Sequence, residues 1–493
     1  VPLALTVSAT TATQLALTAA TATPALGAGT ATTIKATDSY GNVISSYTGS
    51  KSLVFSGAAA SPGGNAPTVT NSTGTAVAFG TATAITFTAG VAEAAKGSGG
   101  EIVLYKSGAT SITATQSTLT TPTPLVLTPP AGAASKFVLA AATTAPVAGA
   151  SDELTITAQD TYGNTATSYA GSKSLIFSGA NPSPGGNQPT VTNASGTAVA
   201  FGTATAISFN AGVAEPAKGS GGKAVLYKVE TASLKATQEA LTTPTALTIT
   251  PTAAATAKLV LSASTTTPTA GTAFNLTTTA QDAYGNTATA YTGSKNITFG
   301  GAAASPSGTL PTVANSAGTA VNFGTATALS FSAGVATASG TTNGSAKLYK
   351  AGATSVTASD GTVSTATALA LTVAAGTATR LAVSGLTASP GSIGSPCLFA
   401  CSVTGVGNSG TIKAKAALTD ANGNVVANTG TAKSVTVTVT TGGTITGSPL
   451  SIATGGATSA TEFTYKSPAS GTFTNTITLA STGLTSATVT VTR

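Results

Sequence analysis

The chain has 493 residues, of which only 7% are charged, and its 20 Lys and Arg against 13 Asp and Glu give a formal net charge of +7. It contains no His, Met or Trp. Absence of His removes the usual general base near neutral pH and the imidazole metal ligand, and so few carboxylates leave few pairs for acid–base catalysis. This composition argues against an enzyme and predicts a structural or binding protein without a cofactor or bound metal.

The charges are scattered, since the Lys and Arg residues stand singly along the chain rather than in runs. Nucleic-acid binding depends on a concentrated basic face, so we expect no nucleic-acid partner. Polar residues or Gly and Pro interrupt every apolar run, so no membrane span is expected. Because Met is absent and the opening VPLALTV lacks the features of a signal peptide, we expect that a signal has been removed from a secreted or cell-surface protein.

The first element in chain order is a predicted alternating β-strand made of Pro2, Leu3, Ala4, Leu5, Thr6 and Val7. Three later segments resemble it and each closes a repeat, residues 124–128, 246–250 and 368–372. Residues 1–11 therefore read as a last strand without a repeat in front of it. The segment either packs on the first repeat, or remains from trimmed upstream repeats, or is donated to the sheet edge of another copy of the chain.

Internal repeats organise the rest of the sequence. The segment Asp38-Ser39-Tyr40-Gly41-Asn42 returns at 160–164 and 282–286, two steps of 122 residues, and in a looser form at 420–424. Phe and Tyr keep the same period, and a unit of this length has the size of a domain. We predict four tandem domains with a shorter and divergent last member, residues 12–130, 131–252, 253–375 and 376–493.

Each repeat has the pattern of an all-β domain. Short runs of Thr, Val, Ile, Phe and Tyr alternate with turns of Gly, Pro, Asn and Ser. In residues 51–57, Leu53 and Phe55 fall on one face of a strand, and Leu104 is predicted to point inward from a later one. No long segment has a helical period with caps, so we expect two packed sheets in each domain.

The segment Leu154–Asn164 resembles a bacterial immunoglobulin-like repeat of the intimin and invasin kind, in which a strand runs into an Asp-x-x-Gly-Asn turn and a second strand follows. The signature returns at 276–286 and, more loosely, at 416–424. This resemblance implies an all-β chain of four tandem immunoglobulin-like β-sandwich domains in an elongated rod, exposed at a cell surface. It does not imply adhesion, because the family's binding residues usually lie in a distinct terminal domain that this sequence does not show.

The Asp-x-x-Gly-Asn turn is itself a candidate site. Gly supplies a positive φ, and the Asp and Asn side chains bond to nearby backbone, so we interpret the segment as a hairpin turn. A calcium site is the alternative, but it would need several converging oxygens, and Asp38 is the only acidic residue near the first copy.

Two kinds of covalent modification are predicted. Cys397 and Cys401 lie four residues apart and favour a local disulfide, with a pair of buried thiols or a link to another chain as alternatives. Zinc would need two further ligands. Five sequons are candidate N-glycosylation sites that would help to keep so uncharged a surface soluble, at Asn71, Asn193, Asn275, Asn296 and Asn343.

Two functions fit these features. The first is a structural subunit of an extracellular filament or surface layer, pilus-like or S-layer-like, that assembles with itself head-to-tail by β-strand donation. The second is the stalk of a cell-surface adhesin that binds a glycan or host surface. A polysaccharide hydrolase would need two carboxylates facing a groove, and the only adjacent acidic pair, Asp152 with Glu153, has no acidic equivalents in the other repeats.

Overall fold

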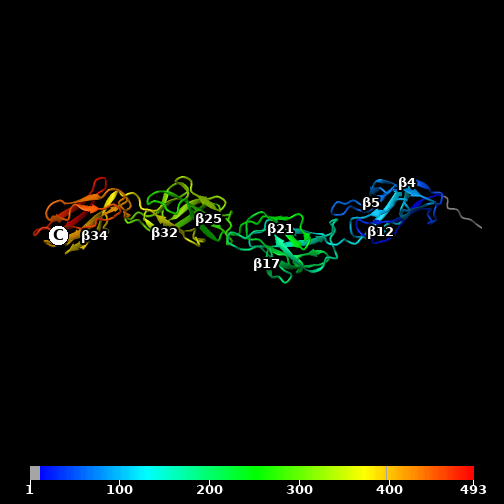
Figure 1. Ribbon diagram of the computed structural model, residues 1–493, viewed down its shortest axis with the longest axis horizontal. Helices are drawn as coiled ribbons and strands as arrows, with labels where there is room; N and C mark the ends of the chain where they lie inside the picture. The colour runs from blue at the N-terminus through cyan, green and yellow to red at the C-terminus, as the bar shows by residue number, and fades with distance from the viewer. Residues whose placement is uncertain (1–10, 396) are drawn as a thin grey trace, which may run out of the picture. The chain divides into compact units, whose positions relative to one another are not determined.

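The structure is a computed structural model that describes residues 11–395 and 397–493. The predicted donor strand, Pro2–Val7, lies outside these residues. Contacts divide the chain into two compact units, Val1–Thr252 and Ala253–Arg493, which are described separately here. The described residues form β-strands and two short 3-10 helices but no α-helix, which confirms the predicted all-β class (Figure 1).

The first unit contains two hydrophobic cores, one within residues 12–130 and one within 131–252. In the first of these repeats the strands pair in the order β7-β4-β10-β11-β1-β3-β8, with β12 on β10, and in a further sheet of the order β2-β9-β5-β6. The elements are β1 Gln14–Ala19, β2 Gly29–Thr30, β3 Thr32–Thr37, β4 Gly49–Ser56, β5 Thr68–Thr70, β6 Ala76–Ala78, β7 Ala82–Phe87, β8 Val91–Glu93, η1 Ala94–Lys96, β9 Ile102–Val103, β10 Thr110–Gln116, β11 Leu119–Thr120 and β12 Leu125–Leu127.

The second repeat builds the same two layers. One sheet has the order β13-β14-β20-β16-β17 with β19 on β14, and the other has the order β18-β15-β21-β22 with β23 on β21. The elements are β13 Lys136–Ala141, β14 Ser151–Gln159, β15 Gly171–Ser178, β16 Thr190–Thr192, β17 Ala198–Ala200, β18 Ala204–Phe209, β19 Val213–Ala214, η2 Pro216–Lys218, β20 Lys223–Val225, β21 Ala232–Gln238, β22 Leu241–Thr242 and β23 Leu247–Ile249.

The second unit also has two cores, and the one within residues 253–375 repeats this topology. Its sheets are β24-β25-β31-β27-β28, with β30 on β25, and β29-β26-β32-β33. The elements are β24 Lys258–Ala263, β25 Phe274–Gln281, β26 Gly293–Gly300, β27 Thr312–Ala314, β28 Ala320–Asn322, β29 Ala326–Phe331, β30 Val335–Thr337, β31 Ser345–Lys347, β32 Gly352–Ser359 and β33 Leu369–Val373.

The fourth repeat differs in its strand order, β34-β37-β41-β39 in one sheet and β35-β36-β43-β42-β38-β40 in the other. It lacks the segment SPGGN…FGTATA, which in the first repeat contributes the hairpin β5–β6 and the strand β7. The elements are β34 Arg380–Ser389, β35 Ser392–Ile393, β36 Ala400–Thr404, β37 Thr411–Thr419, β38 Lys433–Val439, β39 Thr444–Thr446, β40 Leu450–Ile452, β41 Phe463–Lys466, β42 Thr474–Ala480 and β43 Ala487–Thr492.

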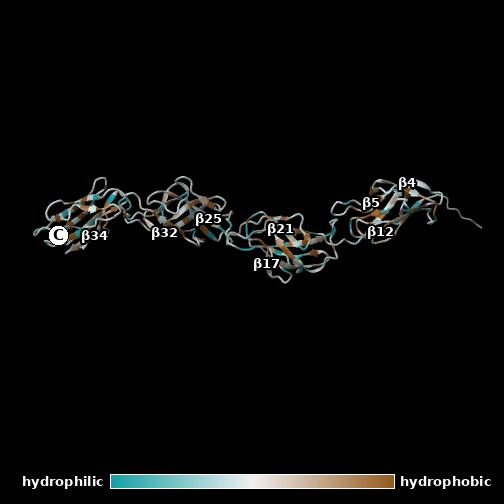
Figure 2. Cartoon of the chain, in the orientation of Figure 1, coloured by the Kyte–Doolittle hydropathy of each residue, from teal (hydrophilic) through white to brown (hydrophobic). Residues whose placement is uncertain are grey.

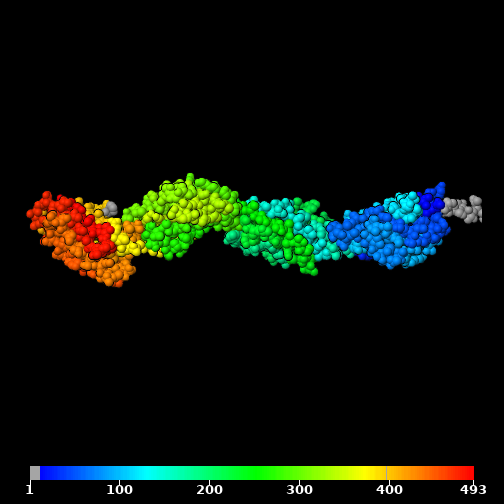
Figure 3. Space-filling view, turned by 90° about the horizontal axis from the view of Figure 1, so that it is seen from above, coloured from blue at the N-terminus to red at the C-terminus, as the bar shows by residue number. Residues whose placement is uncertain are grey.

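The cores follow the strand alternation expected from the sequence. Leu53 and Phe55 on β4 are completely buried, and Leu104 is buried as predicted. Hydrophobic residues accordingly concentrate on the strands, whereas the loops are paler or hydrophilic (Figure 2). Each colour forms one block in the space-filling view because every repeat folds within its own stretch of chain (Figure 3). No helix in the described part of the chain has the length and apolar character that crossing a bilayer requires.

Each of the first three repeats packs a tyrosine from the loop before β4, β15 or β26 against residues of one sheet. The Tyr47 ring packs edge-on against Phe87 with centroids 4.9 Å apart, and the Lys51 ammonium lies 4.9 Å from the same ring centroid. The Tyr47 hydroxyl donates to Oε1 of Gln116 at 2.8 Å. In the third repeat the acceptor is a carboxylate, since the Tyr291 hydroxyl donates to Oδ2 of Asp360 at 2.6 Å.

We expect this carboxylate to make the third repeat sensitive to acid. Partial burial raises the pKa of Asp360, but the hydrogen bonds from Tyr291 and from the N–H groups of Val363 and Thr362 outweigh it and lower the pKa to about 2. Because the folded pKa lies below the ordinary value of 3.8, the stabilisation is present above pH 3.8 and is lost as the pH falls towards 2. Asp360→Gln, which copies the first repeat, should abolish that dependence in residues 253–375.

Amide hydrogen exchange of the full chain between pH 4 and 2 measures the effect, because it separates one repeat from another. The first repeat, with Gln116 in place of the carboxylate, is the internal control. Equal acid sensitivity of the third repeat before and after the substitution would contradict the assignment.

Candidate functional site: the junctions between repeats

The Asp-x-x-Gly-Asn turn is held by its own aspartate. In the second repeat Oδ1 of Asp160 accepts the backbone N–H groups of Tyr162 and Asn164, both at 2.9 Å. Oδ2 accepts the Asn164 side-chain amide at 2.9 Å and the backbone N–H of Gly132, in the linker, at 3.0 Å. One carboxylate therefore fixes both the turn and the chain that leads into the repeat.

Asn164 extends this arrangement across the junction to the preceding repeat. Its side-chain amide donates to the carbonyl oxygen of Tyr105 at 2.9 Å, and its Oδ1 accepts the N–H of Ser107 at 3.0 Å. The carbonyl oxygen of Tyr162 accepts the N–H of Gly63 at 2.8 Å. Three hydrogen bonds thus join two consecutive domains of the first unit.

Close packing accompanies these bonds. The rings of Tyr105 and Tyr162 meet edge to face with centroids 5.0 Å apart. Gly163 has a φ of +85°, and a Cβ on it would lie 2.8 Å from the backbone nitrogen of Gly63. Only glycine satisfies both the left-handed backbone and this approach of two chains.

The second unit repeats the junction between its own two domains. The side-chain amide of Asn424 donates to the carbonyl oxygen of Tyr349 at 2.8 Å, and its Oδ1 accepts the N–H of Ala351 at 2.7 Å. The N–H of Ser307 donates to the carbonyl oxygen of Asn422 at 3.1 Å. The same three hydrogen bonds occur although Asn422 replaces the tyrosine of the other turns.

The corresponding turn of the first repeat points into solvent. Asp38 holds it in the same way, accepting the N–H groups of Tyr40 and Asn42 at 2.9 Å each. Hydrogen bonding, above all from the Asn42 side chain, lowers the pKa of Asp38. Tyr40 is 91% exposed, and within the described residues neither it nor Asn42 bonds to another repeat. Among residues 11–395 and 397–493, the first repeat therefore carries a copy of the joining surface that contacts no other repeat.

These contacts favour the structural interpretation of the turn over a calcium site. The carboxylate oxygens of Asp160 already accept N–H groups, and no other acidic side chain joins them. The described residues contain no group of three or more potential metal-ligating side chains.

The last strands of the repeats are all in place. β12 pairs with β10 over three residues, and beyond it the N–H of Thr128 donates to the carbonyl oxygen of Ala22 at 2.7 Å. β23 and β33 are held in the same way on both sides. β43 lies between β36 and β42 in the fourth repeat. No vacant last-strand position therefore exists among the described residues for a donated strand.

The predicted modification sites are dispersed over the repeats. Cys397 and Cys401 form a disulfide with Cα atoms 4.6 Å apart, and Cys401 belongs to the core of the fourth repeat. Asn275 and Asn296 are exposed on β25 and β26. The other three sequon side chains are half-buried and bonded to neighbouring residues, at Asn71, Asn193 and Asn343.

The acidic pair of the second repeat is split between core and surface. Asp152 is buried, its Oδ2 has no hydrogen-bond partner, and burial is the main cause that raises its pKa. Glu153 faces outward towards Lys223, with an N–O distance of 3.7 Å. The equivalents of Asp152 are Thr30 and Phe274, both buried, so the position belongs to the sandwich interior.

Sequence reasoning missed the bonds that Asn164 and Asn424 make to the preceding repeat. The available signal was the recurrence of Asn after Gly in every copy of the turn, because a hairpin alone does not require an amide there.

No family model matches the chain, and no relative was found among curated proteins. Among solved structures, the chain is similar to the Escherichia coli adhesin FdeC, with 20% identity, a TM-score of 0.31 and coverage of 75% of this chain and 100% of that one. It is similar to invasin, a bacterial integrin-binding protein, with 12% identity, a TM-score of 0.28 and coverage of 97% and 79%. The S-layer protein rSbsC gives 14% identity, a TM-score of 0.18 and coverage of 98% and 54%.

The assignment of the β-sandwich fold itself rests on the strand pairings described above.

A pair of glycine substitutions tests the junction. Gly163→Ala and Gly41→Ala place the same side chain at the same φ of +85°, but a Cβ on Gly41 meets nothing within 4 Å. Both variants should lose about 1 kcal/mol from the left-handed strain, and only Gly163→Ala should also open the junction. Amide exchange should then quicken at Gly63 and Ser107, whose N–H groups bond across it. Equal exchange in the two variants would rule out a coupled junction.

Asp152→Thr, which copies the first repeat, should stabilise the second repeat at pH 7. The buried carboxylate has a raised pKa, so its cost is absent below the ordinary value of 3.8 and grows as the pH rises through the folded pKa. The Thr30 hydroxyl of the first repeat is likewise buried without a partner, so the substitution removes only the cost of burying a charge and should gain about 1 kcal/mol in thermal unfolding experiments. A gain that persists unchanged at pH 3 would show that the charge is not responsible.

Proposed function

We propose that this protein is a structural subunit of an extracellular filament or surface layer, and that it assembles with itself head-to-tail by donation of the segment Pro2–Val7 to a sheet of a neighbouring copy. The observation that carries the proposal is the first repeat's turn, Asp38–Asn42, whose equivalents in other repeats join domains. The described chain that follows the donor segment begins beside this turn, since Gln14 lies opposite Thr37 in the sheet.

The chemistry of the donor segment supports strand addition. Leu5 corresponds to Leu127, which is completely buried as the last strand of the first repeat, and Ala4 corresponds to Val126, which is 55% exposed. The segment therefore carries one apolar face and one outer face, the pattern that an added strand needs.

The neighbour would accept this strand at a sheet edge, because the last-strand positions are filled. The fourth repeat does not offer the junction contacts for this purpose. Ser467 follows Tyr465 and Lys466 as Ser107 follows its own tyrosine and lysine, but its N–H donates to the carbonyl oxygen of Gly410 within the same repeat. Edge strands such as β40 pair on one side only, which leaves backbone groups for addition.

Several features support an extracellular setting. The disulfide Cys397–Cys401 suits an oxidising compartment. The low charge content leaves a surface rich in Thr, Ser, Ala and Gly. Ordered self-association or attached glycans would protect a protein with such a surface from precipitation. The similar solved structures are described as an adhesin, a bacterial integrin-binding protein and an S-layer protein.

The second candidate function is the stalk of a cell-surface adhesin. The repeated junction favours it, because three hydrogen bonds and a packed glycine between consecutive domains suit a spacer. A stalk requires no self-association, so the state of assembly separates the two functions.

The experiment compares the full chain with a chain that lacks residues 1–8, by negative-stain electron microscopy and sedimentation. The full chain should form regular polymers and the truncated chain should remain monomeric. Leu5→Asp should act like the truncation because it charges the apolar face, and Ala4→Asp should leave assembly unchanged. Polymers from the truncated chain would overturn strand donation, and a monomeric full chain would favour the stalk.

A further inference from the structure

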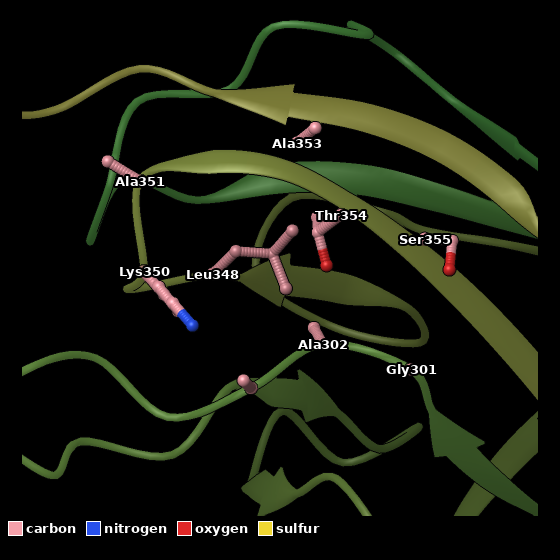
Figure 4. Close-up of a pocket in the computed structure, with 9 residues that line it drawn as sticks. Gly301, Ala302, Leu348, Lys350, Ala351, Ala353, Thr354 and Ser355 are labelled. Carbon is pink, nitrogen blue, oxygen red and sulfur yellow. The ribbon is translucent and has the colours of Figure 1, made fainter.

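The first and third repeats share a surface depression next to the junction contacts, because its lining includes Ser107 in the first repeat and Ala351 in the third. In the third repeat it has a volume of about 460 Å³ and is lined by Ala302, Ala303, Leu348, Lys350 and Thr354, among others. Figure 4 shows the Lys350 side chain directed across this space towards the segment that leads into Ala302, with the Thr354 hydroxyl and Leu348 beside it.

The first repeat has a smaller depression, of about 200 Å³, at the same place. Its lining includes Ala59, Leu104, Lys106 and Thr110, which stand two periods of 122 before lining residues of the third repeat. The depression is therefore a property of the repeat and not an accident of one loop.

The second repeat fills the same place with a carboxylate of its own. One oxygen of Glu230 accepts the backbone N–H of Asn181 at 2.8 Å, and the other accepts the Asn181 side-chain amide at 3.0 Å. The Lys228 ammonium lies 2.9 Å from that second oxygen. Partial burial raises the pKa of Glu230, but the bonds from Asn181 and Lys228 outweigh it and hold the pKa below its ordinary value.

Two of the three donors to this carboxylate, the backbone N–H and the lysine, remain in the other two repeats, but the Asn181 side-chain amide and the carboxylate do not. Glycine, Gly108 or Gly352, stands at the position of Glu230, whereas Lys106 and Lys350 stand at the position of Lys228. No carboxylate lies within 4 Å of either lysine in the described residues.

The backbone donor is also unused. Ala59 and Ala303 stand at the position of Asn181, both are exposed, and neither N–H donates a hydrogen bond to any described residue. An N–H and an ammonium thus face an open space at the point where the second repeat places a carboxylate.

We propose that the depressions of the third and first repeats are binding sites for a carboxylate-bearing sugar, a uronic acid, whose carboxylate takes the place of Glu230. The backbone N–H of Ala303 and the Lys350 ammonium bind the two carboxylate oxygens, charge-assisted contacts of the kind that Glu230 makes. The Thr354 hydroxyl is available to the sugar ring.

Size and number favour a sugar acid over an acidic side chain. A volume of about 460 Å³ lies in the range of small-molecule sites and exceeds what a carboxylate needs. Two sites on one chain gain avidity for a polymer that repeats its acidic residue, whereas each single site is weak. An acidic polysaccharide is therefore the ligand that the two depressions fit.

The test measures binding of D-glucuronate to the full chain by ligand-observed NMR, with glucose and acetate as the neutral and sugar-free probes. Glucuronate should bind, glucose should not, and acetate should bind about tenfold more weakly. The double variant Lys106→Gln and Lys350→Gln should lose about tenfold in affinity, because each site loses a charge-assisted hydrogen bond.

Two further variants separate this site from general charge effects. Lys295→Gln removes a lysine that lies over the Tyr291 ring and lines neither depression, and it should leave binding unchanged. Glu230→Ala should add a third site by freeing Asn181 and Lys228, and so raise the amount of glucuronate bound at saturation.

Equal binding of glucose and glucuronate, or of acetate and glucuronate, would overturn the proposal. So would an equal loss in the Lys295→Gln control and the double lysine variant. None of these outcomes depends on polymer formation, so the binding site and the proposed assembly can fail independently.

Discussion

The aspartate of the Asp-x-x-Gly-Asn turn is the interaction on which the arrangement of each junction depends. A single carboxylate, such as that of Asp160, accepts N–H groups from the turn, from the asparagine side chain and from the incoming linker. Buried N–H groups are costly without acceptors, and the turn brings several of them together. With its donors satisfied locally, the turn can lie against another domain without exposing unpaired backbone.

The asparagine of the turn either stabilises the turn alone or also joins it to another repeat, depending on whether a repeat lies next to it. Asn164 is buried and bonds to the backbone of the preceding repeat, whereas Asn42 in the same turn is exposed and bonds only to Asp38. The turn is therefore preformed before docking, and docking adds three hydrogen bonds and a ring contact rather than a refolded loop. Preorganisation of this kind lowers the entropy cost of association.

Much of the fold could be predicted because it depends on local periodicity. The alternation that placed Leu53 and Phe55 inside needs no knowledge of distant contacts, and the period of 122 residues marked the turn in the first three repeats. The junction contacts could not be predicted, because the sequence does not show which backbone atoms lie opposite Asn164. The place of Glu230 was missed for the same reason, since its donor Asn181 is 49 residues away in the chain.

Differences between repeats are more informative about binding than their shared residues. At one position the repeats carry Gly108, Glu230 and Gly352, while the neighbouring lysine is unchanged. A lysine that served only solubility would not require an unused backbone N–H beside it. Where glycine replaces Glu230, however, the lysine and such an N–H both line a depression. The second repeat shows what chemistry satisfies the shared backbone N–H and lysine, because its carboxylate contacts both of them and keeps its charge. A repeat protein can thus contain both an occupied and an open form of one site, and the occupied form identifies the ligand class that the open form accepts.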